Sequence, residues 1–144
     1  MPDTAKFTIL VVDDAEENID VLLELLGDDY DVSVAMDGET ALEDISETRP
    51  DLILLDIMMP GMDGFEVCRR LKADPETSSI PIIFITGKTE TEDMVKGYDL
   101  GAADYVTKPF NPPELMARLK AHLRIIEQQR IIDEAQAIIK KLKG

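Results

Sequence analysis

Five short apolar runs, separated by longer amphipathic stretches, constrain the fold more than any other feature of this sequence. The runs occupy residues 7–12, 32–35, 52–55, 82–85 and 105–106. Three of them are rich in Ile, Leu and Val with little alternation, as is typical of parallel strands that are covered on both faces. This strand–helix repeat predicts an α/β fold, a doubly wound five-stranded parallel sheet with helices on both faces.

The stretches between the runs have helical periodicity. Ile19, Leu22 and Leu26 recur at the spacing of one helix face, and similar patterns lie near residues 41–45, 65–71 and 94–98. Asp74-Pro75 and Gly101 predict where the third and fourth helices end. Asn111 is a favourable N-cap and Pro112 suits the first helical position, so a fifth helix is predicted to begin there.

The fifth helix is predicted to be much longer than the sheet requires. Its pattern runs to about residue 142, and two residue sets repeat every seven positions: Ile125, Ile132, Ile139 and Ala121, Gln128, Ala135, Leu142. Such an a/d seam is typical of a coiled coil. Two alternatives remain open, a long surface helix folded back on its own domain and a dimerising helix or signalling linker. We predict a domain at residues 1–124 and a helical extension at residues 125–144.

Composition argues against several functions. Acidic residues number 30 and basic residues 15, and the formal net charge of −15 disfavours direct contact with nucleic acid or an anionic membrane. No apolar run approaches the roughly 20 residues of a membrane helix, and no secretory signal pattern is present. Cys68 is the only cysteine, which excludes an internal disulfide and fits a reducing compartment. We therefore expect a cytoplasmic protein.

Polar residues follow four of the five predicted strands. Strand one is followed by Asp13 and Asp14, strand three by Asp56, strand four ends in Thr86, and Lys108 follows strand five. The carboxyl ends of parallel strands meet at one edge of a sheet, where ligands of such folds bind. Three carboxylates, a hydroxyl and an ammonium group are therefore expected to converge there.

This set of groups predicts phosphoryl chemistry. Clustered carboxylates repel one another and usually hold a cation, and oxygen ligands favour Mg²⁺, with Mn²⁺ as an alternative. Lys108 would supply a point positive charge for an anion beside the metal. A carboxylate, a metal and a lysine around a phosphate-sized gap suggest an aspartyl phosphate, with Asp56 as the nucleophile.

The sequence of residues 7–124 resembles the receiver domain of two-component response regulators. The resemblance rests on the motifs ILVVDD, DLILLDIMMPGMDGFEVCRRLK, PIIFITG and GAADYVTKPF. It implies a flavodoxin-like receiver fold with strand order 2-1-3-4-5. It also implies that Asp56 is the phosphoacceptor, that Lys108 pairs with a phosphoryl oxygen, and that the Lys108-Pro109 bond is cis.

The resemblance assigns further roles at this edge. Asp13, Asp14, Asp56 and the backbone carbonyl of Met58 correspond to the magnesium ligands, with Asp14 the direct ligand of the acidic pair and Asp13 acting mostly through water. Thr86 corresponds to the switch hydroxyl, and Tyr105 to the aromatic side chain that turns inward when Thr86 moves. Modulating positions, which tune dephosphorylation or leave room for Tyr105, are Met58, Gly87 and Lys88.

The predicted function is a phosphorylation-controlled switch rather than an enzyme. A sensor histidine kinase, a phosphotransfer protein or a small phosphodonor would phosphorylate Asp56, and the face made by helix four, strand five and helix five would change its partner affinity. A homodimer through that face and the C-terminal helix is expected, with an output domain outside this chain, although a stand-alone receiver remains open. The alternatives are a phosphorylation-independent dimerisation scaffold and an aspartyl-phosphate phosphatase.

Overall fold

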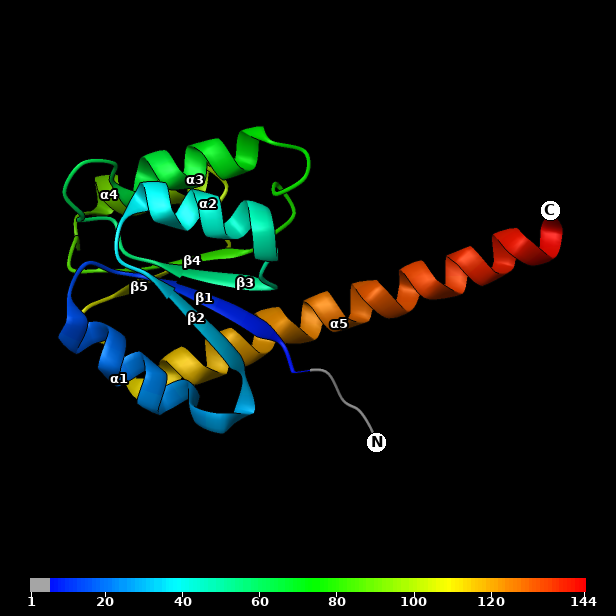
Figure 1. The fold of residues 1–144 in the computed structure, drawn as a ribbon, viewed down its shortest axis with the longest axis horizontal. Helices are drawn as coiled ribbons and strands as arrows, with labels where there is room; N and C mark the ends of the chain where they lie inside the picture. The colour runs from blue at the N-terminus through cyan, green and yellow to red at the C-terminus, as the bar shows by residue number, and fades with distance from the viewer. Residues whose placement is uncertain (1–5) are drawn as a thin grey trace.

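The computed structural model describes residues 6–144 and alternates strands with helices (Figure 1). Its five strands form one parallel sheet in the order β2-β1-β3-β4-β5, which confirms the predicted doubly wound α/β fold. The elements are β1 (Thr8–Val12), α1 (Glu16–Leu26), the 3₁₀ turn η1 (Gly27–Asp29), β2 (Asp31–Ala35), α2 (Gly38–Thr48), β3 (Leu52–Leu55), α3 (Gly64–Ala73), β4 (Ile82–Thr86), α4 (Thr91–Asp99), β5 (Asp104–Thr107) and α5 (Pro112–Lys143).

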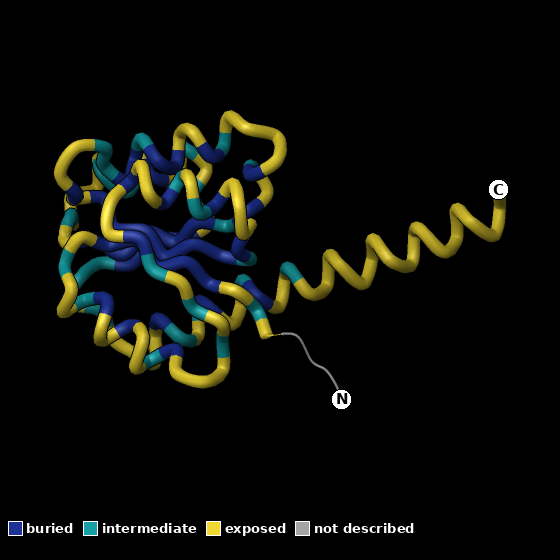
Figure 2. The backbone as a smooth tube through the Cα atoms, viewed as in Figure 1, coloured by how far each residue is buried: buried dark blue, intermediate teal, exposed yellow. Residues whose placement is uncertain are grey.

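The sheet is covered on both faces, which explains why its three central strands, β1, β3 and β4, lack alternation. Leu10 and Val12 of β1 point into a core beneath α2, α3 and α4. Their neighbours Ile9 and Val11 point into a second core, beneath α1 and α5. Every other residue of a strand faces the same side, so a strand between two helical layers must be apolar throughout. Figure 2 shows the buried strands between the more exposed helices.

The start of α5 lies where the sequence predicted it. The Asn111 side chain accepts a hydrogen bond from the Glu114 backbone N–H at 3.0 Å, so it caps α5, and Pro112 opens the helix. Asp63 caps α3 in the same way, accepting from the Glu66 N–H at 2.9 Å. The Lys108-Pro109 peptide bond is cis, as the resemblance implied.

Helix α5 extends well beyond the sheet. Leu115, Leu119 and Leu123 are buried against the sheet, whereas residues 127–144 are exposed along their whole length and project from the body (Figures 1 and 2). The alternative of a helix folded back on its own domain is therefore wrong, because every residue beyond Arg130, which contacts Asp51, is exposed. Within residues 6–144, no helix combines the length and apolar character that crossing a membrane requires.

Candidate functional site

The strand ends bring the predicted acidic residues together. Val12 of β1 lies beside Leu55 of β3 in the parallel register, so the following residues, Asp13 and Asp56, leave the sheet side by side. Carboxylate oxygens of Asp13, Asp14 and Asp56 all lie within 4.8 Å of one another. Asp13 and Asp56 are buried, and Asp14 is exposed.

Lys108 connects two of these carboxylates from the end of β5. Its Nζ lies 2.9 Å from Oδ2 of Asp13 and 3.4 Å from Oδ2 of Asp56. Asp13 accepts two further hydrogen bonds, from the Ala15 backbone N–H at 2.9 Å and from the Asn18 amide at 3.3 Å. Asp13 is therefore fixed in place, while Asp56 is held mainly by one ammonium group.

Burial makes Asp56 the electrostatically costly member of the cluster. Its pKa is raised above the ordinary value because burial disfavours the charged form, and although Lys108 opposes the shift, Asp13 adds to it. A buried carboxylate beside a second carboxylate, compensated by one lysine, retains excess negative charge. The site therefore fits a divalent cation, for which Asp13, Asp14 and Asp56 offer the oxygen donors that Mg²⁺ prefers.

This excess charge predicts that the Asp56 carboxylate destabilises the folded state. In metal-free buffer at pH 7, Asp56→Asn is expected to raise the free energy of unfolding by on the order of 1 kcal/mol. Because the folded pKa is raised, the folded state binds more protons than the unfolded state, so wild-type stability increases as the pH falls through that pKa. The difference in the free energy of unfolding between wild type and Asp56→Asn should disappear toward about pH 4. Urea unfolding of both proteins over a range of pH tests this. A less stable variant at pH 7 would contradict the electrostatic account.

The backbone of Lys88 links the two predicted switch residues. Its N–H donates to Oγ1 of Thr86 at 3.3 Å, and its carbonyl oxygen accepts from the Tyr105 hydroxyl at 2.8 Å. Thr86 and Tyr105 are both buried. Burial, followed by the charges of Asp93 and Asp56, raises the pKa of Tyr105 to about 12, so this hydroxyl remains a donor. Tyr105 thus already lies inward in this state.

The positions predicted to modulate the site, Met58, Gly87 and Lys88, closely follow Asp56 and Thr86 in the chain. Met58 is 58% exposed, and its backbone N–H lies 3.4 Å from Oδ1 of Asp56. A Cβ added at Gly87 would meet no atom within 4 Å, which leaves open space beside Thr86. Sequence reasoning missed Gly64, where an added Cβ would overlap the Asp56 carbonyl oxygen. No periodicity reveals such a close approach, because it depends on the path of the loop.

The acidic cluster lies together with Lys108 at the carboxyl ends of the strands, and Thr86 ends β4 at the same edge. A comparison with protein families gives a match over the same residues. Residues 9–120 match the family described as the response regulator receiver domain. The chain belongs to this family. As a receiver domain it is a signalling domain of two-component systems, in agreement with the resemblance seen in the sequence.

Relatives of known sequence and structure support the same assignment. The DNA-binding response regulator MtrA of Mycolicibacterium smegmatis is 49% identical over 128 residues, covering 88% of this chain and 55% of MtrA. The response regulator PleD of Caulobacter vibrioides is 48% identical over 127 residues, which cover 88% of this chain and 27% of PleD. The BeF3-activated N-terminal receiver domain of Klebsiella pneumoniae RstA is 38% identical, covers 81% of this chain and 98% of that one, and gives a TM-score of 0.76. The chain thus spans about half the length of MtrA and about a quarter of PleD.

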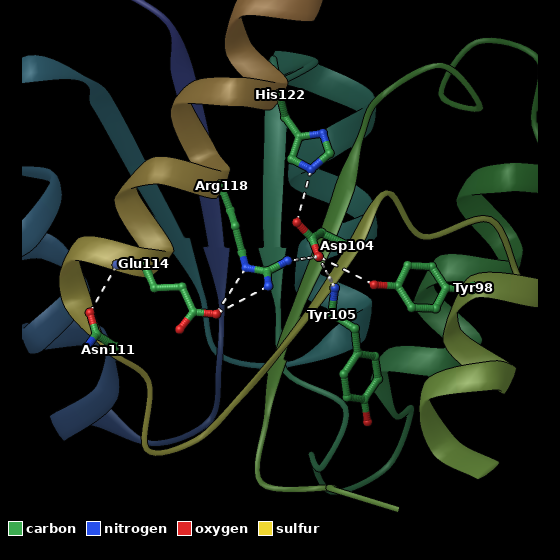
Figure 3. A network of polar contacts seen from close by, with 7 residues as sticks. All are labelled: Tyr98, Asp104, Tyr105, Asn111, Glu114, Arg118 and His122. Atoms are coloured by element: carbon green, nitrogen blue, oxygen red, sulfur yellow. Dashed lines mark hydrogen bonds and ion pairs between the residues drawn. The ribbon is translucent and has the colours of Figure 1, made fainter. Parts of the chain in front are cut away.

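A second polar cluster of this receiver was not anticipated from the sequence. Asp104, at the start of β5, is buried and accepts from Arg118 at 2.8 Å, while Nε2 of His122 lies 3.2 Å away (Figure 3). The Tyr98 hydroxyl and the Tyr105 backbone N–H also donate to it, at 3.4 and 2.9 Å. The predicted strand at residues 105–106 was one residue short at each end, which left Asp104 in a loop.

Asp104 joins α4, β5 and α5 through these contacts. Burial raises the pKa of its carboxyl group, but the hydrogen bonds from Tyr105, Arg118 and His122 outweigh this, so the pKa lies below the ordinary value. Asp104→Asn is expected to lower the free energy of unfolding by about 1–3 kcal/mol, because hydrogen bonds to a charged group are stronger than neutral ones. Urea unfolding beside Asp99→Asn, an exposed position on α4, measures this, and equal stability of the two variants would contradict it.

Proposed function

We propose that this receiver accepts a phosphoryl group on Asp56. The observation that carries the proposal is the buried Asp56 carboxylate, 3.4 Å from Lys108 and within one cluster with Asp13 and Asp14. The donor would be a cytoplasmic histidine kinase, a phosphotransfer protein or a small acyl phosphate. The product would be an acyl phosphate on the chain, so the receiver acts as a phosphoacceptor rather than as an enzyme that turns over a separate substrate.

The transfer itself needs few protein groups. A carboxylate oxygen of Asp56 forms the new bond to phosphorus, while the bond from phosphorus to the donor nitrogen or oxygen breaks and its electron pair leaves with the donor. Asp56 must be ionised to attack, which its position beside Lys108 favours. The Lys108 ammonium, already between Asp13 and Asp56, would then bond an oxygen of the transferred group.

Asp13, Asp14 and Asp56 would hold Mg²⁺, with the carbonyl oxygen of Met58 as a further ligand. The ion would supply positive charge that offsets the charge of the transferring oxygens. The oxygens of Asp13 already accept from Lys108, Ala15 and Asn18. The exposed carboxylate of Asp14 is therefore better placed for direct coordination, with Asp13 acting through water. Mn²⁺ would satisfy the same oxygen donors.

The signal would leave the site through Thr86, Lys88 and Tyr105. A phosphoryl group on Asp56 would attract the Thr86 hydroxyl, whose oxygen now accepts from the Lys88 N–H. The Tyr105 hydroxyl donates to the backbone carbonyl oxygen of Lys88. A shift of Thr86 would therefore favour a different position of the β4–α4 loop, and the α4-β5-α5 face would change its affinity for an output domain, a partner or a second copy.

The experiment is phosphoryl transfer from acetyl phosphate followed by intact-mass measurement. One phosphoryl group per chain is expected with Mg²⁺ and none with excess chelator, and peptide mapping should place the group on the peptide that contains Asp56. An idle dimerisation scaffold would show no adduct in either buffer. A phosphatase would release phosphate from excess donor over many turnovers without an adduct that outlasts the donor.

A further inference from the structure

The projecting end of α5 carries an apolar stripe that no part of this chain covers within residues 6–144. Ile132 is 47% and Leu142 82% exposed, and the other large members of the stripe lie between these values. An isolated helical segment of this length is marginal in water, and most helices are stabilised by packing an apolar face. The stripe consists of Ile131, Ile132, Ala135, Ile138, Ile139 and Leu142.

The stripe follows heptad positions, and the charges avoid them. With Ile125 at position a, positions a and d hold Ile125, Gln128, Ile132, Ala135, Ile139 and Leu142, and Ile131 and Ile138 occupy g. Acidic residues of the segment, Glu127, Asp133 and Glu134, all fall at b or c. Positions e and g usually carry the charges that select a partner. In the middle of this segment they are uncharged: Gln129 and Gln136 occupy e, and Ile131 and Ile138 occupy g.

The body of the receiver contacts mainly the b, e and f side of the helix. Leu115, Leu119 and Leu123, which pack on the sheet, occupy positions e, b and f of the same heptad frame. Arg130, also at f, forms an ion pair with Asp51 before β3 and lies over the Phe7 ring. Beyond Arg130 every residue of the helix is exposed, so a second helix can approach the stripe there without meeting the body.

We propose that residues 125–142 pair with the same segment of a second copy as a parallel, in-register, two-stranded coiled coil. The central e and g positions carry no charge, so two identical helices would not repel each other there. For the same reason, no charge at these positions favours a different partner over a second copy. Ile at position a favours two strands, and the one polar seam residue between residues 125 and 142, Gln128, is matched only when it meets Gln128 of the second copy. An antiparallel pair would set Gln128 against an apolar residue.

The seam also continues onto the body. Arg118, which bonds Asp104, is seven residues before Ile125 and so occupies position a, and Ala121 occupies d. The small Ala121 side chain allows two helices to come close at this level. The proposal extends the proposed function, because it would place two α4-β5-α5 faces near one another, but it does not depend on phosphorylation.

Cysteine cross-linking of the full chain tests the proposal with a matched pair of variants. Ala135→Cys places a thiol at d, and Ala137→Cys places one at f, both on the exposed helix. Oxidised glutathione serves as the oxidant, and two protein thiols become one disulfide as it is reduced. Pairing raises the effective concentration of the second thiol to millimolar. Ala135→Cys is therefore expected to cross-link roughly 10²-fold faster than Ala137→Cys at about 10 μM protein. The native Cys68 is buried, so wild type should stay monomeric on a denaturing gel.

A third variant settles the direction of the two helices. Gln128→Cys should cross-link as readily as Ala135→Cys if the helices are parallel and in register. Equal rates for Ala135→Cys and Ala137→Cys would overturn the coiled coil, and a cross-link at Ala135→Cys without one at Gln128→Cys would overturn the parallel register. The same rates are expected when Asp56→Asn is added, so the result is independent of whether Asp56 accepts a phosphoryl group.

Discussion

Replacing Lys108 with Ala is expected to slow phosphoryl transfer from acetyl phosphate to Asp56 by roughly 10²-fold. The Lys108 ammonium is the one cation bonded to both Asp13 and Asp56 among the described residues. Without it, an anionic donor would approach three carboxylates with less compensating charge, and one donor to the transferring oxygens would be lost. The measurement is the rate of adduct formation by intact mass at saturating Mg²⁺.

Lys120→Ala is the matched control for this prediction. Lys120 is exposed on α5, and its removal changes the net charge by the same amount. The control should react at the wild-type rate, and circular dichroism should show both variants folded. A Lys108→Ala protein that reacts within about twofold of wild type, less than 0.5 kcal/mol in barrier, would show that Lys108 contributes only to the resting charge balance.

Replacing Gly64 with Ala should cost about 3 kcal/mol of unfolding free energy, the upper end for a residue that is too large for its site. The added Cβ would overlap the Asp56 carbonyl oxygen and lie 2.8 Å from Cα of Ile57. Both neighbours are backbone, and the Gly64 N–H donates to the Ile57 carbonyl at 2.9 Å. The strain can be relieved only by moving the loop that carries Asp56, so adduct formation should slow as well.

Gly87→Ala makes the same chemical change at an open position. An added Cβ there meets no atom within 4 Å, so stability should remain within about 0.5 kcal/mol of wild type. Urea unfolding of the two variants side by side separates close packing from the general effect of removing a glycine. Equal losses of stability at Gly64 and Gly87 would contradict the close-approach argument.

Most of the site could be predicted because all parallel strands end at the same edge of the sheet. Any parallel sheet with this order places the residues after β1 and β3 side by side at one edge, so Asp13 and Asp56 had to be neighbours. Lys108 follows β5 at the same edge, beyond β4, and its long side chain reaches both carboxylates. Sequence patterns also predicted α5, since its Asn111 cap, Pro112 and heptads are local features. Those signals need no knowledge of the tertiary contacts.

The features that sequence reasoning missed depend on tertiary contacts. Asp104 stands before an apolar strand and looks like a turn residue, and its partners Arg118 and His122 lie on another element. Their spacing of four on α5 gave a weak signal that two side chains share a face. The inward position of Tyr105 follows from its bond to the Lys88 carbonyl, which no local pattern reveals. The roles of Thr86 and Tyr105 as switches stay predictions.

The measurement that tests the central claim most directly is intact mass after incubation with acetyl phosphate and Mg²⁺, on wild type, Asp56→Asn and Asp99→Asn. Asp99 is exposed on α4, so its variant controls for loss of one carboxylate. The account predicts one phosphoryl group on wild type and on Asp99→Asn, and none on Asp56→Asn. The same adduct on Asp56→Asn, or none on wild type, would contradict Asp56 as the phosphoacceptor.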